Sequence, residues 1–173
     1  MDLKIYIDHE DISYKWLKQF YNFALLNNTN CYAFALGLMN PVSQTGNNYM
    51  PGFISDSVPS HHYYSYDEMK RCVVNDLIAL NRKFEEVSFD TPIDENCYKI
   101  GLGYSLIDED DPETYGFHFI KQTTEKEEAI WTEKMGWEYP LNNEDVIESF
   151  HDHFEETTFF RVGKMKQKKR YLS

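Results

Sequence analysis

Cysteine is scarce in this sequence. Only three cysteines, Cys31, Cys72 and Cys97, occur among 173 residues, and no CxxC pair is present. Cysteines so few and so scattered exclude a disulfide framework and argue against structural zinc. The pattern is typical of a protein that folds in a reducing compartment, so we expect a cytoplasmic protein.

Long hydrophobic runs are also missing. No apolar segment approaches the about 18 residues needed to span a bilayer. The start of the chain, "MDLKIYIDHED", is acidic and lacks the apolar block of a signal peptide. Internal repeats, low-complexity blocks and Gly/Ser linkers are absent as well. We therefore expect one domain covering residues 1–173, with no membrane partner.

Basic residues are outnumbered, with 17 Lys and Arg against 29 Asp and Glu, which gives a net charge of −12. A surface of this sign repels nucleic acids and anionic membranes, so a nucleic-acid partner is not expected. Five of the 17 basic residues fall in a basic C-terminal tail, residues 164–173, which leaves −17 on the rest of the chain. Such a charge run is typical of a solvated terminus.

What the sequence does contain is enough apolar material for a core: hydrophobic residues make up 42% and aromatics 16%. Apolar residues at helical spacing predict helices over residues 12–26, 31–39, 65–85 and 143–155. In the third of these, Ser65 and Glu68 have the spacing of a capping box. A long loop is expected over residues 40–59, where Asn, Gly and Pro are frequent.

From Cys97 onward the period of the pattern changes to two, as a half-buried strand requires. Strands are predicted over residues 97–106, 115–122, 128–137 and 157–166, with the acidic turn "DEDDPET" after the first. Helices followed by a meander of strands indicate an α+β fold, with N-terminal helices packed on an antiparallel sheet.

Cys31 is the first candidate functional residue. It stands in "NNTNCYAFALG", between polar residues suited to capping a helix and an apolar, helix-forming run. A thiolate is favoured at a helix start, where unpaired N–H groups attract negative charge. The other interpretation is a small buried core residue, because cysteine is among the residues most often buried. The remaining cysteines, Cys72 and Cys97, are expected to be structural.

His118 is the candidate base, because a nucleophilic thiol needs a base and the base needs an orienting partner. Phe117 and Phe119 share one face of the predicted strand, which leaves His118 on the other. On the next strand, Trp131 and Glu133 share a face. If the two strands pair antiparallel, Glu133 can accept a hydrogen bond from His118; alone, His118 also fits a structural histidine.

These residues carry a resemblance. The ordered segments "NCYAFALG", "PG" at Pro51–Gly52, "GFHFIKQ" and "WTEKMG" are similar to a bacterial and phage group of the NlpC-type papain-like cysteine hydrolases. The motifs of that group read N-C-Y-x-Y-A-L, P-G, F-H-W/F-Y-R and W-S-H-K-x-G, and the match covers residues 28–137. The resemblance implies a papain-like fold with Cys31 as nucleophile, His118 as base and Glu133 as third group. Glu133 replaces the histidine of the motif.

Further residues complete the expected site. The backbone N–H of Cys31, with Asn30 or Asn28 as a side-chain donor, is expected to stabilise an oxyanion. Tyr32 and Trp131 are expected to line the cleft. No cofactor is expected, and no metal: His61 and His62 lie in a loop, and His151 and His153, two apart on a predicted helix, point to different sides.

Two functions stay open. The first is a cysteine-dependent peptidase or amidase that cleaves a peptide or protein substrate through an acyl-enzyme; a transferase would use the same thiol chemistry. The second is a catalytically inactive papain-like fold that acts as an acidic binding or inhibitor protein for a protein partner.

Overall fold

The computed structural model of the chain describes residues 7–8, 29–39, 49–61, 63–125, 128–135 and 145–164. The predicted helix over residues 12–26 and nearly all of the basic tail lie outside these ranges. In chain order, the elements are β1 (Ile7–Asp8), α3 (Cys31–Ala35), β2 (Leu38–Met39), α4 (Tyr66–Ala79), β3 (Phe84–Val87), β4 (Cys97–Leu106), β5 (Tyr115–Glu125), β6 (Glu128–Glu133), α5 (Asp145–His153) and β7 (Glu156–Gly163). Among the described residues, no helix has the length and apolar character needed to cross a membrane.

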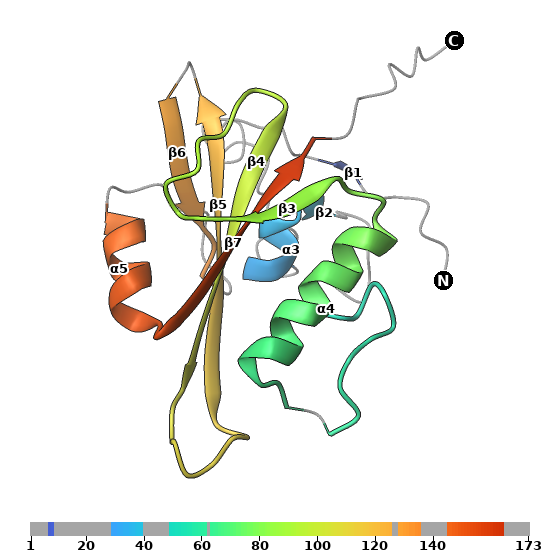
Figure 1. Ribbon diagram of the computed structural model, residues 1–173, viewed down its shortest axis with the longest axis vertical. Coiled ribbons are helices and arrows are strands. Elements are labelled where there is room, and N and C mark those ends of the chain that lie inside the picture. The colour runs from blue at the N-terminus through green and yellow to red at the C-terminus, as the bar shows by residue number, and fades with distance from the viewer. Residues whose placement is uncertain are drawn as a thin grey trace.

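Five strands form an antiparallel sheet in the order β3-β7-β4-β5-β6 (Figure 1), which confirms the α+β class. The prediction of a simple meander is wrong at one point. The last described strand, β7, lies between β3 and β4, so the chain returns across the sheet to enter it next to the edge strand β3. Strands β4, β5 and β6 do follow one another as predicted.

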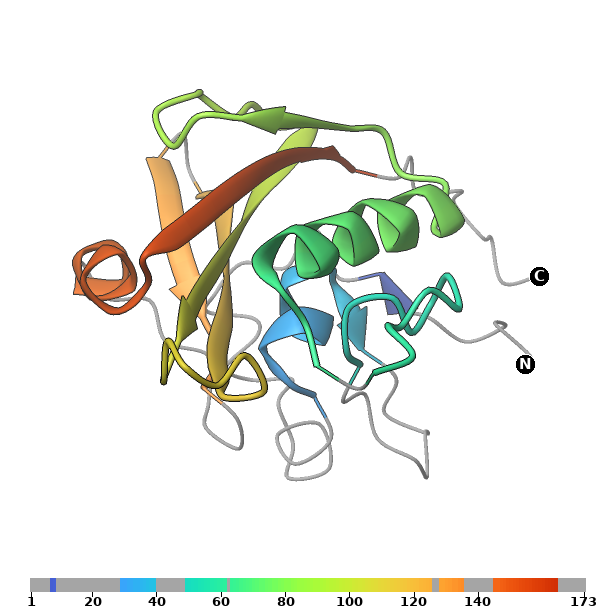
Figure 2. The same ribbon diagram turned by 60° about the horizontal axis from the view of Figure 1, so that its bottom comes forward.

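Helices cover both faces of the sheet. Figures 1 and 2 show α3 and α4 on one face and α5 on the other. The predicted alternation in β4 is confirmed, since Tyr98, Ile100, Leu102 and Tyr104 all join the core under α3 and α4. The strand is nevertheless buried over nearly its whole length, because α5 covers the face that was expected to meet solvent.

Glycines on the second face of β4 allow this close cover. A Cβ added to Gly103 would lie 2.5 Å from the ring of Phe154 and 2.8 Å from Phe150. Gly103 therefore lets two aromatic rings from the α5 region rest directly on the backbone of the sheet. The residue paired with Gly103 on β5 is His118.

The helix α4 begins as predicted but ends early. The Ser65 side chain accepts from the Glu68 N–H and the Glu68 carboxylate accepts from the Ser65 N–H, which confirms the capping box. The helix stops at Ala79 instead of continuing to residue 85. Asn81 takes a left-handed φ of 55°, and asparagine is one of the few residues that adopts this conformation readily, so the chain turns there and enters β3 at Phe84.

The helix α3 is likewise shorter than expected. Gly37, with a φ of 72°, turns the chain after five helical residues. Leu38 and Met39 then pair with β1 as a strand instead of continuing the helix. The result is a short, buried helix whose first residue is Cys31.

Candidate active site

Cys31 occupies the first position of α3 and is half-buried. The predicted cap is confirmed: the Asn30 Oδ1 atom accepts a hydrogen bond from the Ala33 N–H at 2.9 Å. The Asn30 Nδ2 atom donates to the Tyr49 carbonyl at 2.7 Å. Both ends of this amide therefore hold the helix start in place. The role of Asn30 as an oxyanion donor stays a prediction, and Asn28 lies outside the described residues.

His118 and Glu133 meet where β6 ends. Strands β5 and β6 pair antiparallel as predicted, and their pairing finishes at Ile120 and Glu133. His118 lies two residues before Ile120 and hence on the same face of β5. Its Nε2 atom is 3.1 Å from the Glu133 Oε2 atom, and only 12% and 17% of the two side chains are exposed. The predicted contact between imidazole and carboxylate is confirmed.

The electrostatics of His118 link it to Cys31 as well as to Glu133. Burial on its own lowers the pKa of His118, but side-chain hydrogen bonds to Cys31 and Glu133, together with their negative charges, raise the pKa to about 9. The Nε2 atom faces Glu133, which leaves Nδ1 as the second ring nitrogen. The imidazole is therefore protonated at neutral pH, between a thiol on one side and a carboxylate on the other.

The short helix alters the expected source of thiolate stabilisation. A helix of five residues has few aligned peptide dipoles, so the N-terminal charge effect anticipated for Cys31 is small. The imidazole of His118, whose pKa is raised by Cys31 and Glu133, is a positive charge that acts on the same site.

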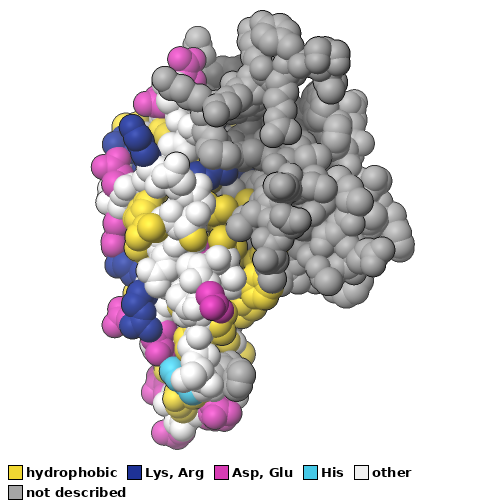
Figure 3. All heavy atoms as spheres, turned by 90° about the vertical axis from the view of Figure 1, so that its right-hand side faces the viewer, with side chains coloured by type: hydrophobic (Ala, Val, Ile, Leu, Met, Phe, Trp, Pro, Cys, Tyr) yellow, Lys and Arg dark blue, Asp and Glu magenta, His cyan; other side chains and the backbone are white. Residues whose placement is uncertain are grey.

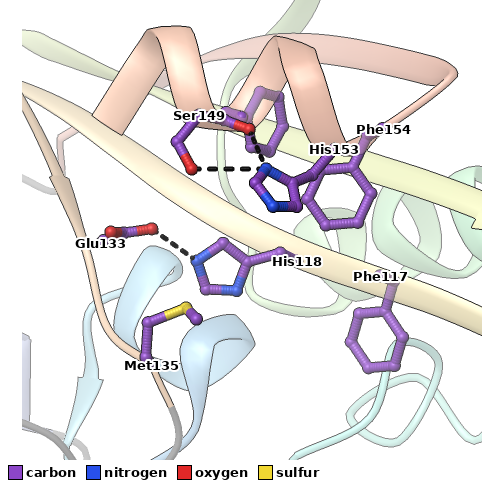
Figure 4. Close-up of a pocket in the computed structure, with 8 residues that line it drawn as sticks. Phe117, His118, Glu133, Met135, Ser149, His153 and Phe154 are labelled. Atoms are coloured by element: carbon purple, nitrogen blue, oxygen red, sulfur yellow. Dashed lines mark hydrogen bonds and ion pairs between the residues drawn. The ribbon is translucent and has the colours of Figure 1, made fainter. Parts of the chain in front are cut away.

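A pocket of about 230 Å³ opens beside the imidazole and the carboxylate (Figure 4). Its lining comes from β5, the end of β6 and α5: Phe117, His118, Glu133, Met135, Ser149, Phe150, His153 and Phe154. Cys31 is not part of this lining. The sequence patterns did not indicate the contribution of α5, because the side of the sheet on which a helix packs depends on contacts distant in sequence.

Two residues expected in the cleft lie elsewhere. Tyr32 is fully buried, its ring packs at a tilt of 45° against that of Phe119 with centroids 4.6 Å apart, and its hydroxyl donates to Asp76 at 2.8 Å. Trp131 packs against the apolar cluster on the α5 side of the sheet, and its ring lies nearly parallel to that of Phe89, with centroids 5.8 Å apart. The expectation is wrong for Tyr32, whose side chain has no exposed surface; Trp131 is partly buried and is not among the residues that line the pocket described above.

Asp76 is the residue near the site that the sequence patterns left unassigned. Its buried carboxylate accepts four hydrogen bonds, from the Tyr32 hydroxyl, the Gly52 N–H, the Ser55 N–H and the Ser55 hydroxyl, at 2.6–2.8 Å. Asp76 thereby ties α4 to α3 and to the Pro51–Gly52 turn. An acidic residue inside the apolar stripe of the helix was the signal for this role.

The remaining cysteines and histidines have other surroundings. Cys72 and Cys97 are buried free thiols, and burial raises the pKa of each. His151 contacts the ring of Phe89, whereas His153 turns toward the pocket, so the two point to different sides as predicted. Within the described ranges, no three His, Cys, Asp or Glu residues gather as a metal site would require.

The arrangement of Cys31, His118 and Glu133 can move a proton and present a nucleophile. The half-buried Cys31 helps to raise the pKa of the His118 imidazole, and the Glu133 carboxylate orients that ring through Nε2. Comparison with protein-family models and with curated proteins finds no match for this chain.

Proposed function

We propose that the protein is a cysteine-dependent hydrolase, a peptidase or amidase, with Cys31 as nucleophile, His118 as general acid and base, and Glu133 as the group that orients the imidazole. The observation that supports the proposal is His118 itself: it is hydrogen-bonded to Glu133, and Cys31 and Glu133 together raise its pKa to about 9. A papain-like fold of the NlpC type is part of the same proposal.

The proposed reaction proceeds in two steps. The Cys31 thiolate attacks the carbonyl carbon of an amide, and the imidazolium of His118 donates its proton to the leaving nitrogen as the C–N bond breaks. This leaves a thioester and a neutral imidazole. His118 then takes a proton from water, the resulting hydroxide adds to the thioester carbonyl, and the C–S bond breaks to restore the thiolate and the imidazolium.

An oxyanion forms in both steps. Within α3, the Phe34 N–H is the first donor to a backbone carbonyl, that of Asn30, and the Ala33 N–H is capped by the Asn30 side chain. The N–H of Cys31 is therefore outside the hydrogen bonds of the helix. We propose that it stabilises the oxyanion, as a backbone donor next to the nucleophile does in other acyl-transfer sites.

The substrate class follows from the thiol chemistry and the reduced cysteines. The three cysteines are free thiols, which fits a reducing compartment. We propose a cytoplasmic peptide or protein as substrate. Hydrolase and transferase share the first step, and only the second, in which water or another amine accepts the acyl group, separates them.

Thiol labelling tests the state of Cys31. Iodoacetamide at neutral pH, followed by mass spectrometry of the peptides, is expected to modify Cys31 before Cys72 and Cys97, because burial raises the pKa of the other two thiols. His118→Gln removes the positive charge beside the sulfur and is expected to slow the labelling of Cys31. Equal and slow labelling of all three thiols would contradict a thiolate–imidazolium pair.

Turnover tests the reaction. A fluorogenic peptide library is expected to reveal hydrolysis that Cys31→Ala abolishes and that the matched variant Cys97→Ser retains. Circular dichroism of each variant establishes that the fold is intact. Hydrolysis that persists in folded Cys31→Ala would rule out Cys31 as the nucleophile.

The alternative, an inactive acidic binding protein, predicts inert Cys31 in both experiments. On the face shown in Figure 3, the described Asp and Glu side chains are interspersed with Lys and Arg and form no single acidic patch. That distribution gives a basic partner no concentrated target on this face. The enzyme remains the function that the site supports best.

A further inference from the structure

The pocket beside His118 has apolar walls that are built into the fold. Phe150 is buried, and its ring lies 5.3 Å from that of Phe154. The Phe154 ring in turn lies nearly parallel to the imidazole of His118, at 6.5 Å and 15°. Because Gly103 has no side chain, both phenylalanine rings rest against the backbone of β4 next to His118. Phe117 and Met135 extend the apolar lining.

The polar groups around the pocket are paired with one another. Glu133 accepts from His118, and the His153 Nδ1 atom donates to the Ser149 carbonyl at 2.6 Å. Figure 4 shows these two pairs, one from the strands and one from α5, facing each other across the pocket. An occupant therefore finds few polar groups that need a new partner, which favours an apolar ligand.

The size of the pocket restricts that ligand further. Sites for drug-sized molecules measure about 300–1,000 Å³, whereas this pocket measures about 230 Å³. The volume suits one amino-acid side chain. With four apolar residues in the lining, an aromatic or a branched aliphatic side chain is the best match.

The position of the pocket relative to the nucleophile decides which part of a substrate it receives. Cys31 raises the pKa of His118 but does not line the pocket, and the pocket is closed by α5, on the opposite face of the sheet from α3. The imidazole thus separates the nucleophile from the pocket. In the proposed reaction the acyl carbon bonds to the sulfur, and the leaving nitrogen receives the proton of the imidazole, so the residue attached to this nitrogen is the one that lies toward the pocket.

We propose that the pocket beside His118 binds an aromatic or branched aliphatic side chain of the residue on the leaving-group side of the scissile amide. This inference rests on the proposed hydrolase function and gives it a substrate preference. Phe154 and Phe150 form the floor of the subsite, and Met135 lies at its rim.

Substrates that differ only in the leaving residue test the preference. With one acyl group and with Phe, Leu, Gly, Asp or Lys after the scissile bond, kcat/KM is expected to be about 10-fold or more higher for Phe and Leu than for Gly, as several methylene groups in an apolar pocket imply. Ser149→Phe fills the pocket and is expected to remove the preference. Glu148→Phe, an exposed neighbour on α5 outside the lining, is the matched control and retains it.

A binding measurement separates this inference from the proposed function. In Cys31→Ala, which turns over no substrate, the ring resonances of His118 are followed by NMR during titration with phenylalaninamide, leucinamide or glycinamide, the amines that such reactions would release. Saturable shifts are expected with the first two and not with glycinamide, and Ser149→Phe is expected to weaken them.

The outcomes are distinct. Hydrolysis that depends on Cys31 but shows equal kcat/KM for all leaving residues would overturn the proposed subsite. The proposed hydrolase function would stand. If no substrate is cleaved, the hydrolase proposal fails and the titration decides on the subsite. Saturation by phenylalaninamide but not by glycinamide supports an apolar subsite beside His118. Equal behaviour of the three amides overturns the subsite as well.

Discussion

Raising the pH should destabilise the protein through His118, and the size of the effect follows from its surroundings. The folded protein holds the His118 proton up to pH about 9, whereas an unfolded chain releases it near 6.5. Between these values the folded state binds more protons than the unfolded state, so the free energy of unfolding falls as the pH rises. The stabilisation is complete below about pH 6.5 and is lost as the pH passes about 9.

The magnitude is the free energy that corresponds to this difference in pKa. A rise in the pKa from 6.5 to about 9 corresponds to about 3 kcal/mol, at roughly 1.4 kcal/mol for each unit of pKa. Little of this should be lost to solvent screening, because only 12% of the His118 side chain is exposed.

Urea unfolding of the wild type and of His118→Gln, from about pH 6 to about pH 10, measures the effect. The difference between the wild type and the variant cancels the contribution to stability of other groups that titrate in the same pH range. The stability advantage of the wild type over the variant should shrink by about 3 kcal/mol across this interval. Parallel stability curves for the two proteins would refute the proposed placement of an imidazolium between a thiol and a carboxylate.

Two further substitutions test the structure around the site. Gly103→Ala forces a Cβ into the aromatic rings below it and should lower the free energy of unfolding by about 1–3 kcal/mol in urea, whereas Gly116→Ala, where nothing lies within 4 Å of the new atom, should cost less than half of that. Asp76→Asn weakens the buried acceptor of four hydrogen bonds and should lower the free energy of unfolding by about 2–3 kcal/mol in thermal or urea unfolding. Asp67→Asn, on the exposed side of the same helix, should lower it by only a few tenths of a kcal/mol. Equal losses within either pair would contradict the contacts described.

The parts of the site that the sequence predicts are those set by local periodicity. Alternation along β5 places His118 opposite Phe117 and Phe119, and the short connection to β6 makes antiparallel pairing the simplest arrangement. Given that pairing, the positions of His118 and Glu133 on one face follow directly. The cap at Asn30 is likewise a local signal, and the structure contains it.

The parts that the sequence does not predict depend on distant contacts. The end of α4 at Ala79 is decided by the left-handed turn at Asn81 and by the pairing of Phe84 with Val162, nearly eighty positions later. Trp131 shares a face with Glu133, but a stacking contact with Phe89 holds it in the core. Neither partner is visible in a pattern that spans a few residues.

The placement of β7 between β3 and β4 has a consequence for how the protein is made. Because this strand comes last among the described elements and forms ladders with both neighbours, β3 stays apart from β4 until the ribosome has released residues 156–163. During translation Cys31, His118 and Glu133 are all synthesised before β7, the strand that completes the sheet. A nascent chain therefore carries all three residues before the sheet beneath them is complete.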